Sequence, residues 1–326
     1  MPVRFTSPSL GGQRESFLEK GHWQIGVAYR RLRADKWFVG TQETPAATPF
    51  GRPLSLDINS LDFSVTYGVT HRLSLMLTVP FSSGTQTRFY ADTNQHHVNG
   101  HGLGDVNLVA TYWLRDPDDV PRANASIGLG MKSPSGNNHF QDDFWLANGT
   151  VSRNVVDQSV QLGDGGWGVM LQVMAYQRLS ARFTAYFVGS YLLSLRDTTD
   201  VPSPIAASAL GPAVPLAVPD VYQARAGLAF GLAPSQGVSA SLGARIDGIP
   251  QGDIIGGRDL AFRRPGYTLF VDPTVSWRRG GDELTLSMPI RVHQNFQLSD
   301  IDKQRNRTGG GDLADYLVFF GYTHRF

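Results

Sequence analysis

Residues 61–81, "LDFSVTYGVTHRLSLMLTVPF", alternate apolar and polar side chains in two runs that a short polar stretch separates. The apolar positions are Leu61, Phe63, Val65, Tyr67 and Val69 in the first run and Leu73, Leu75, Leu77, Val79 and Phe81 in the second. A period of two is the period of a β-strand, because successive side chains point to opposite faces. The stretch therefore predicts two antiparallel strands joined by a tight turn, each with one apolar and one polar face.

The same alternation recurs along the whole chain and predicts twelve strands. Their approximate ranges are 23–29, 61–69, 73–81, 106–114, 125–131, 167–175, 183–193, 222–230, 238–246, 267–277, 284–292 and 316–326. The connections before even-numbered strands are long, and those before odd-numbered strands are short. Outer-membrane barrels have an even number of strands, short periplasmic turns and long external loops. We therefore expect an all-β fold, a transmembrane up-and-down antiparallel β-barrel of about 12 strands with short periplasmic turns and long extracellular loops.

The two faces of the strands indicate which side meets the membrane. Within hydrocarbon every backbone N–H and C=O must be bonded, so a sheet can span a bilayer only by closing on itself. A soluble β-sandwich also alternates and is the alternative interpretation. Aromatic residues favour the membrane barrel, because they fall at both predicted ends of the apolar face, as bilayer girdles do. One end has Trp23, Tyr67, Tyr112, Trp277, Tyr322 and Phe326, and the other has Tyr29, Trp167, Tyr191, Tyr222 and Tyr267.

The polar face is expected to line a pore. The predicted lining residues are Arg30, Asp62, Lys132, Arg225, Arg245, Asp247, Asp272, Arg291, His293 and Arg325. Basic residues outnumber acidic ones in this set, which would favour anions or carboxylated aromatics, since pore-lining charge sets selectivity. The alternative is that the arginines pair with Asp62, Asp247 and Asp272 and fill the interior.

Composition limits the other possibilities. The chain has 326 residues, a net charge of +1 and no cysteine, so it has no broad field for nucleic acid and no disulfide or thiolate chemistry. No run approaches the roughly 20 apolar residues of a transmembrane helix. Residues 1–20 lack the apolar core of a secretory signal, so the chain is either a processed product or one not exported. We expect residues 1–20 to form a periplasmic N-terminal segment or a lumen plug, and residues 21–326 a single transmembrane β-barrel.

Three positions are expected to disturb the strand pattern. Pro273 and Pro289 each lack a ladder donor, so each should mark a bulge or a local gap in pairing. The stretch "PLSLDINS" (53–60) places its apolar residues at even positions, whereas residues from Leu61 onward use odd ones. A bulge near Asn59 or Ser60 would account for that switch.

The chain ends on an aromatic strand. Phe320, Tyr322 and the final Phe326 share one face of "DYLVFFGYTHRF" (315–326). This ending resembles the carboxyl-terminal signal of bacterial outer-membrane proteins, which the barrel-assembly machinery reads. His324 departs from the pattern, because a hydrophobic residue is usual at that place. The resemblance implies assembly into the bacterial outer membrane.

Four blocks resemble a family of outer-membrane transporters named for the meta-pathway of phenol degradation. The blocks are "YGVTHRLSLMLTVPF" (67–81), "GLGDVNLVATYWL" (102–114), "LGMKSPSG" (129–136) and "QLGDGGWGV" (161–169), with a weaker match at "LTLSMPIRVHQN" (284–295). The resemblance implies an outer-membrane location and passage of small apolar or aromatic compounds.

These features favour a porin-like outer-membrane channel for passive uptake of small molecules, aromatic or anionic. The alternative is a structural or docking barrel that holds a partner protein through its long external loops or its lumen. An enzyme is not expected, because no "GxSxG" motif occurs. His96, His97 and His101 lie close enough to be weak candidates for a metal site, although solvated loop histidines are the simpler interpretation. We expect no cofactor.

Overall fold

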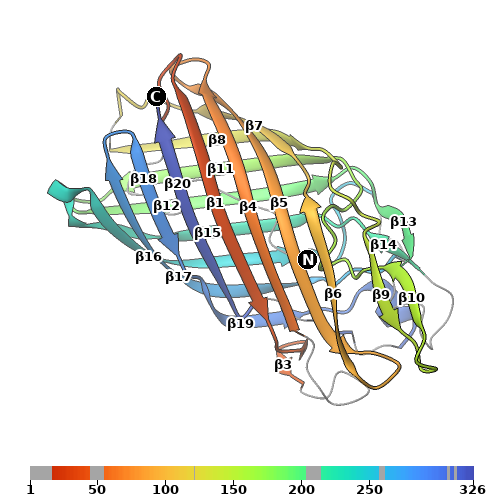
Figure 1. The fold of residues 1–326 in the computed structure, drawn as a ribbon. Helices are drawn as coiled ribbons and strands as arrows, with labels where there is room; N and C mark the ends of the chain where they lie inside the picture. Colours follow the sequence, from red (N-terminus) through yellow and green to blue (C-terminus); the bar gives the residue numbers. More distant parts are fainter. Residues whose placement is uncertain are drawn as a thin grey trace.

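The computed structural model describes residues 17–44, 55–120, 122–202, 214–256, 261–306, 309–311 and 314–326. Its main feature is a closed antiparallel barrel of twelve strands, in which the first strand pairs with the last (Figure 1). The wall strands in order are β1 (Trp23–Ala34), β4 (Ser55–Gly68), β5 (Leu73–Phe89), β7 (Asn107–Trp113), β8 (Ala123–Lys132), β11 (Gly168–Arg178), β12 (Phe183–Ser194), β15 (Val221–Ala233), β16 (Val238–Ile249), β17 (Gly266–Arg279), β18 (Asp282–Ser287) with β19 (Ile290–Phe296), and β20 (Tyr316–Arg325). The predicted fold class is confirmed.

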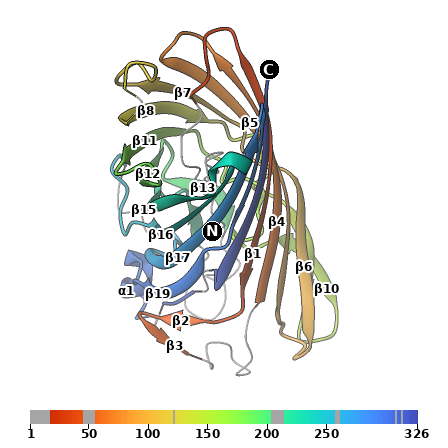
Figure 2. The ribbon, with the colours of Figure 1, turned by 90° about the vertical axis from the view of Figure 1, so that its left-hand side faces the viewer.

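Long and short connections separate to opposite ends of the barrel, as predicted. In the described part of the chain, the short end holds short turns, such as the 3-10 turn η1 (Pro234–Gln236), together with residues 17–22 and the carboxyl terminus. The long end carries β2 (Phe38–Val39), β3 (Gln42–Glu43), β6 (Gln95–Leu103), β9 (Gln141–Trp145), β10 (Val151–Val155), β13 (Thr198–Pro202), β14 (Pro215–Ala217) and α1 (Asp300–Gln304). Figure 2 shows β2, β3 and α1 gathered at this end. No helix in the described part of the chain has the length and hydropathy to cross a membrane.

The outer face of the wall is apolar and the inner face is polar. Phe63, Leu129 and Val275 are among the large apolar side chains exposed on the outside, Leu129 by 60%. Polar side chains such as Ser126, Thr268 and Ser287 are buried inside. Trp23 and Tyr67 form a ring contact at 4.5 Å within the predicted aromatic belt at the short end. This polarity is the one a lipid-facing barrel needs and the reverse of that of a soluble sandwich.

Both strand-breaking prolines lie at one gap in the wall. Pairing of β17 with β18 begins at Thr274, and pairing of β17 with β19 ends at Val271, so Pro273 faces the break that contains Pro289. The N–H of Met288 donates to the carbonyl of Pro273 at 3.1 Å, which keeps the wall closed. The predicted local gap is confirmed.

The expected bulge near Asn59 and Ser60 is wrong. Strand β4 pairs without a register shift from Ser55 to Gly68 with β5, and from Leu56 to Tyr67 with β1. The apolar residues Leu56 and Ile58 simply point inward, where they belong to a buried apolar cluster at the long end. The face that is apolar changes there because the interior itself becomes apolar.

The terminal strand closes the barrel. Residues 316–325 of β20 pair with β1, while residues 319–324 pair with β18 on the other side. Phe320 and Phe326 are exposed on the outer face, and the Tyr322 hydroxyl donates to Asp282 Oδ1 at 2.7 Å. Their recognition by an assembly machinery stays a prediction. The segment predicted over residues 1–20 lies mostly outside the described residues; of its described part, Leu18 is buried and the Phe17 carbonyl accepts from Arg325 Nη1 at 3.4 Å.

Candidate functional site

Charged side chains cross the middle of the lumen as neutral pairs. Arg30 Nε lies 3.1 Å from Asp62 Oδ2 on one side of the barrel. On the other side Arg225 Nη2 lies 2.9 Å from Asp272 Oδ2, and Arg245 Nε lies 3.0 Å from Asp247 Oδ2. These six residues, here called the charged layer, carry three positive and three negative groups. The charges of the layer therefore cancel.

Aromatic rings complete the environment of the two buried arginines. Arg225 and Arg245 are opposite each other on β15 and β16 and are almost inaccessible to water. The Arg245 guanidinium stands 4.8 Å from the centre of the Phe319 ring, and that of Arg225 stands 5.5 Å from the Tyr186 ring. Cation–π contacts of this kind stabilise guanidinium groups that are away from water. They account for donors such as Arg225 Nε that have no hydrogen-bond acceptor.

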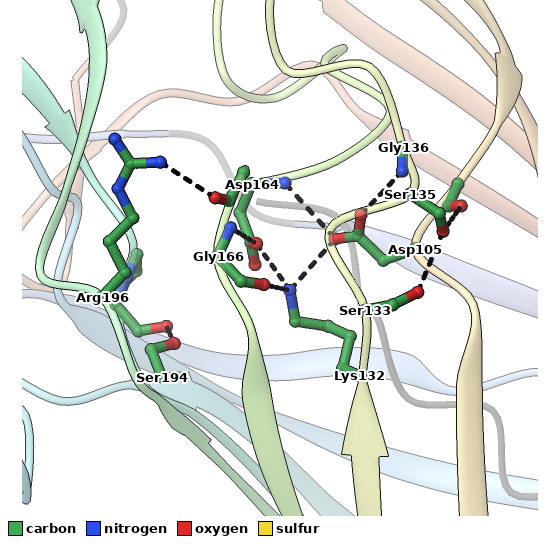
Figure 3. Close-up of polar contacts among 12 residues, drawn as sticks. Asp105, Lys132, Ser133, Ser135, Gly136, Asp164, Gly166, Ser194 and Arg196 are labelled. Atoms are coloured by element: carbon green, nitrogen blue, oxygen red, sulfur yellow. Dashed lines mark hydrogen bonds and ion pairs between the residues drawn. The ribbon is translucent and has the colours of Figure 1, made fainter.

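Lys132, at the end of β8, binds two other segments through its ammonium group (Figure 3). Its Nζ lies 2.5 Å from Asp164 Oδ1, 3.2 Å from Asp105 Oδ2 and 2.6 Å from the Gly166 carbonyl. The Gly136 N–H donates to Asp105 Oδ1 at 3.0 Å, which adds the chain just after β8. All three charged side chains are at most 5% exposed. This set, here called the Lys132 cluster, fixes the long connection between β8 and β11 to the wall.

Part of that connection enters the barrel. Residues 156–166, here called the inserted segment, are buried at nearly every position. Val160 packs on the inner side of β5 and β6, where a Cβ atom built on Gly84 would lie 3.1 Å from Val160 Cγ1 and one on Gly100 would lie 2.4 Å from the Val160 carbonyl. The two glycines therefore leave the space that the segment occupies.

A second ion pair holds the start of the inserted segment. Arg264 Nη2 lies 3.4 Å from Asp157 Oδ2, and Ser159 donates its backbone N–H to Asp157 Oδ1 at 2.9 Å. Burial raises the pKa of Asp157, but the positive charge of Arg264 and the hydrogen bonds from Ser159 outweigh it, so the pKa lies below its ordinary value. The carboxylate is thus held in its charged form, as an anchor needs.

A cavity of about 80 Å³ remains between the inserted segment and the wall. Ser60, Ser82 and the Arg30–Asp62 pair line it on β1, β4 and β5, and Leu317 and Phe319 line it on β20. Val160 and Leu162 of the inserted segment cover it. The cavity therefore offers apolar surface together with a few hydroxyl and charged groups.

Two other predicted lining residues, Arg291 and Arg325, lie at opposite ends of the barrel. Arg291 pairs with Asp315 and stands over the Phe38 ring at 4.6 Å, at the long end. Arg325 Nε donates to Gln24 Oε1 at 2.9 Å, at the short end.

The prediction that His293 lines the pore is wrong, because His293 lies on the outer surface. It pairs with outward-facing Leu269, while Arg291 pairs with Phe270, so Val292 is an extra residue in the ladder. This bulge turns both Val292 and His293 outward.

The three candidate histidines have separate partners. His96 Nε2 lies 2.7 Å from Asp92 Oδ2 and its ring stacks on Trp145 at 3.9 Å. His97 Nδ1 lies 2.7 Å from Thr87 Oγ1, and His101 contacts the Phe140 ring. Within the described ranges, no group of three His, Cys, Asp or Glu residues is placed to hold a metal ion.

Sequence reasoning missed Asp105, Asp164 and the inserted segment. Their local sequence is polar and does not alternate, so the strand period could not reveal them. The signal that could have found them was the set of blocks "GLGD" (102–105), "LGMKSPSG" (129–136) and "QLGDGG" (161–166). Each block supplies one charged member of the Lys132 cluster.

Comparison with known proteins supports the fold. No description of a protein family matches the sequence, and no curated protein matches it. Among solved structures, an outer membrane channel from Pseudomonas putida F1 matches with a TM-score of 0.63 and 16% identity, covering 96% of this chain and 99% of that chain. A deltaS2 mutant of the monoaromatic hydrocarbon channel TodX matches with a TM-score of 0.50 and 10% identity, covering 95% of this chain and 92% of that chain.

Fold and outer surface together place the chain in a membrane. The matched structures share its closed barrel at low identity, and its exterior is an apolar band between two aromatic belts. The protein is therefore a β-barrel of the bacterial outer membrane. Membership of the phenol-degradation family and the absence of enzyme activity stay predictions.

Proposed function

We propose that the protein is an outer-membrane channel for passive passage of small molecules that have an apolar, aromatic body. The observation that carries this proposal is the lumen cavity beside the inserted segment. Its wall combines the Phe319 ring and Leu317 with the hydroxyls of Ser60 and Ser82. Binding sites for small organic molecules are typically concave, mostly apolar and equipped with a few polar groups.

The charged layer argues against strong selection for anions. Its three arginines are each within 3.1 Å of an aspartate, so little net positive charge faces a passing solute. The excess of basic over acidic residues on the polar face therefore does not produce a net positive charge in this layer, because its arginines pair with aspartates. A neutral monoaromatic compound needs no charged partner in this layer, but the cavity of about 80 Å³ is smaller than the roughly 300–1,000 Å³ of typical ligand sites, so the inserted segment must move to admit it. TodX, whose barrel this chain resembles, is described as a monoaromatic hydrocarbon channel.

The inserted segment supports a closed resting channel. It covers the cavity from the long end, and the Lys132 cluster and the Asp157–Arg264 pair hold it there. Passage then requires this segment to move away from Gly84 and Gly100. The resting protein is expected to conduct small ions poorly.

Uptake of radiolabelled toluene by intact Gram-negative cells tests the proposal. Cells that produce the protein should accumulate toluene faster than cells without it. Ser82→Trp would fill the cavity and should slow uptake. Ser83→Trp is the matched control, because Ser83 is the next residue on β5 and is exposed on the outer side. Uptake no faster than in cells without the protein would contradict the proposal, as would equal uptake by both variants.

The docking alternative has one observation in its favour. The hairpin of β9 and β10 leaves Leu146 and Val151 exposed at its tip. Exposed apolar side chains outside the membrane are candidates for protein contact. Purification of the native complex distinguishes the two functions: a stoichiometric partner lost on Leu146→Ser would favour docking, and a barrel purified alone would disfavour it.

A further inference from the structure

Two isoleucines are left outside on the connection after β16. Ile254 is 67% exposed and Ile255 is 53% exposed. Other apolar residues of the long-end connections, such as Val201, Leu216 and Phe262, are buried together in a cluster of their own. Adjacent exposed aliphatic side chains in a folded loop usually mark a contact surface.

The loop that presents the isoleucines is held firmly. The Ile254 N–H donates to Asp220 Oδ2 at 2.9 Å, and the Asp220 N–H donates to Asp253 Oδ1 at 2.8 Å. Asp253 in turn receives two hydrogen bonds from Arg263, at 3.0 and 2.6 Å. The carboxyl group of Asp220 is fully buried. Exposure of the isoleucines is therefore a fixed feature of the loop.

The Asp220 carboxylate also joins this loop to the aromatic belt at the long end, to which Tyr191 belongs. The Tyr191 hydroxyl donates to Asp220 Oδ2 at 3.0 Å, so Ile254 N–H and the tip of Tyr191 share one acceptor oxygen. Trp167 and Leu195 are half exposed nearby on the wall, and the Leu195 N–H donates to the Trp167 carbonyl at 2.9 Å. The isoleucines thus continue the lipid-facing surface beyond the end of the strands.

The opposite side of the barrel has a different rim. Beyond Tyr29 of the same belt, β1 presents Arg31, whose Nη2 lies 2.6 Å from Asp57 Oδ2, with Arg33 next to them. Exposed ion pairs suit water or lipid headgroups and not acyl chains. The rim of the β1–β4 side is therefore charged, in contrast to the apolar rim beside Tyr191.

We infer that Ile254 and Ile255 insert into the outer leaflet and bind lipid acyl chains, which anchors the connection between β16 and β17 at the membrane surface. Short apolar anchors of this kind bind in proportion to the apolar area that they bury in the interface. The inference depends on the transmembrane barrel and is independent of what the channel carries.

Single-cysteine fluorescence tests the anchor, because the chain contains no cysteine. Ile254→Cys and Ile255→Cys, each labelled with an environment-sensitive NBD group, are reconstituted in phosphatidylcholine vesicles with or without lipids that carry a nitroxide on the acyl chain. Leu146→Cys is the matched control, since Leu146 is also an exposed aliphatic residue of a long-end connection, on the β9–β10 hairpin. Heat-modifiable migration on gels verifies that each variant is folded.

Both labelled isoleucine positions should give blue-shifted emission that the nitroxide lipids quench, while the control position should keep water-like emission. Emission from positions 254 and 255 that matches the control and is not quenched would overturn the inference. Equal quenching at position 146 would also overturn it, because contact would then be a general property of the loops.

Discussion

Replacing Lys132 by methionine should open the lumen. The substitution keeps an unbranched side chain that is one heavy atom shorter, and it leaves the carboxylates of Asp105 and Asp164, at most 5% exposed, without their shared cation. Removing one partner of a buried ion pair typically costs about 3–5 kcal/mol. A penalty of that size shifts the ratio of released to inserted segment by roughly a hundredfold to a few thousandfold. Ionic conductance should rise accordingly.

Single-channel recording in planar bilayers measures the fraction of time that the pore is open. Lys303→Met is the control, because its ion pair with Asp300 at 3.1 Å is exposed on α1 and such pairs contribute about 0–1 kcal/mol. Combining Lys132→Met with Asp105→Asn and Asp164→Asn removes the unpaired charges and should restore much of the closure. Equal open fractions for Lys132→Met, Lys303→Met and the unchanged protein would refute this reasoning.

Three further predictions concern acid, assembly and selectivity. Because the pKa of Asp157 is depressed, its ion pair is complete above the ordinary carboxyl pKa and is lost as the pH falls through the lower folded value. Channel conductance should therefore rise as the pH is lowered. Asp157→Asn should raise the conductance at neutral pH. Phe326→Ser should reduce the fraction of heat-modifiable barrel in outer membranes. It should leave the unfolding of the purified protein unchanged, because Phe326 is 62% exposed. Normal assembly of this variant in cells would count against the predicted carboxyl-terminal assembly signal. Arg225→Ala leaves Asp272 without its cation, at a cost of about 3–5 kcal/mol. The reversal potential in a salt gradient should then move toward cation preference. An unchanged reversal potential would show that the charged layer does not face the conducting path.

The strand pattern predicted the wall because lipid and lumen impose opposite polarities on alternate residues. Phe63 and Asp62 are neighbours in sequence, yet one is exposed to the bilayer and the other is buried in an ion pair. Where the interior is not polar, the alternation of apolar and polar residues gave a wrong prediction. Leu56 and Ile58 point inward, toward an interior that is apolar at the long end, and this looked like a register shift. His293 was misplaced because one extra residue reverses the faces of a strand.

The interior was only partly predictable. Pairing of Arg225 with Asp272 could be offered as an alternative, because both fall on the polar face. The Lys132 cluster could not be derived from spacing, since Asp105 and Asp164 lie 27 and 32 positions from Lys132 and belong to non-repetitive segments. Their meeting depends on how the long connection folds back into the barrel, which no local period encodes.

The most direct test of the account is to lock the inserted segment in place. A Cβ atom at position 84 would lie 3.4 Å from the Cβ of Val160, close to the separation of about 3.5–4.5 Å in disulfides. Gly84→Cys with Val160→Cys should form a disulfide that stops toluene uptake until a reductant is added. Ser83→Cys with His101→Cys, paired residues on the outer side of the same two strands, should leave uptake unchanged when oxidised. Full uptake through the oxidised 84–160 protein, or no disulfide at all between these positions, would contradict the claim that this segment closes the channel.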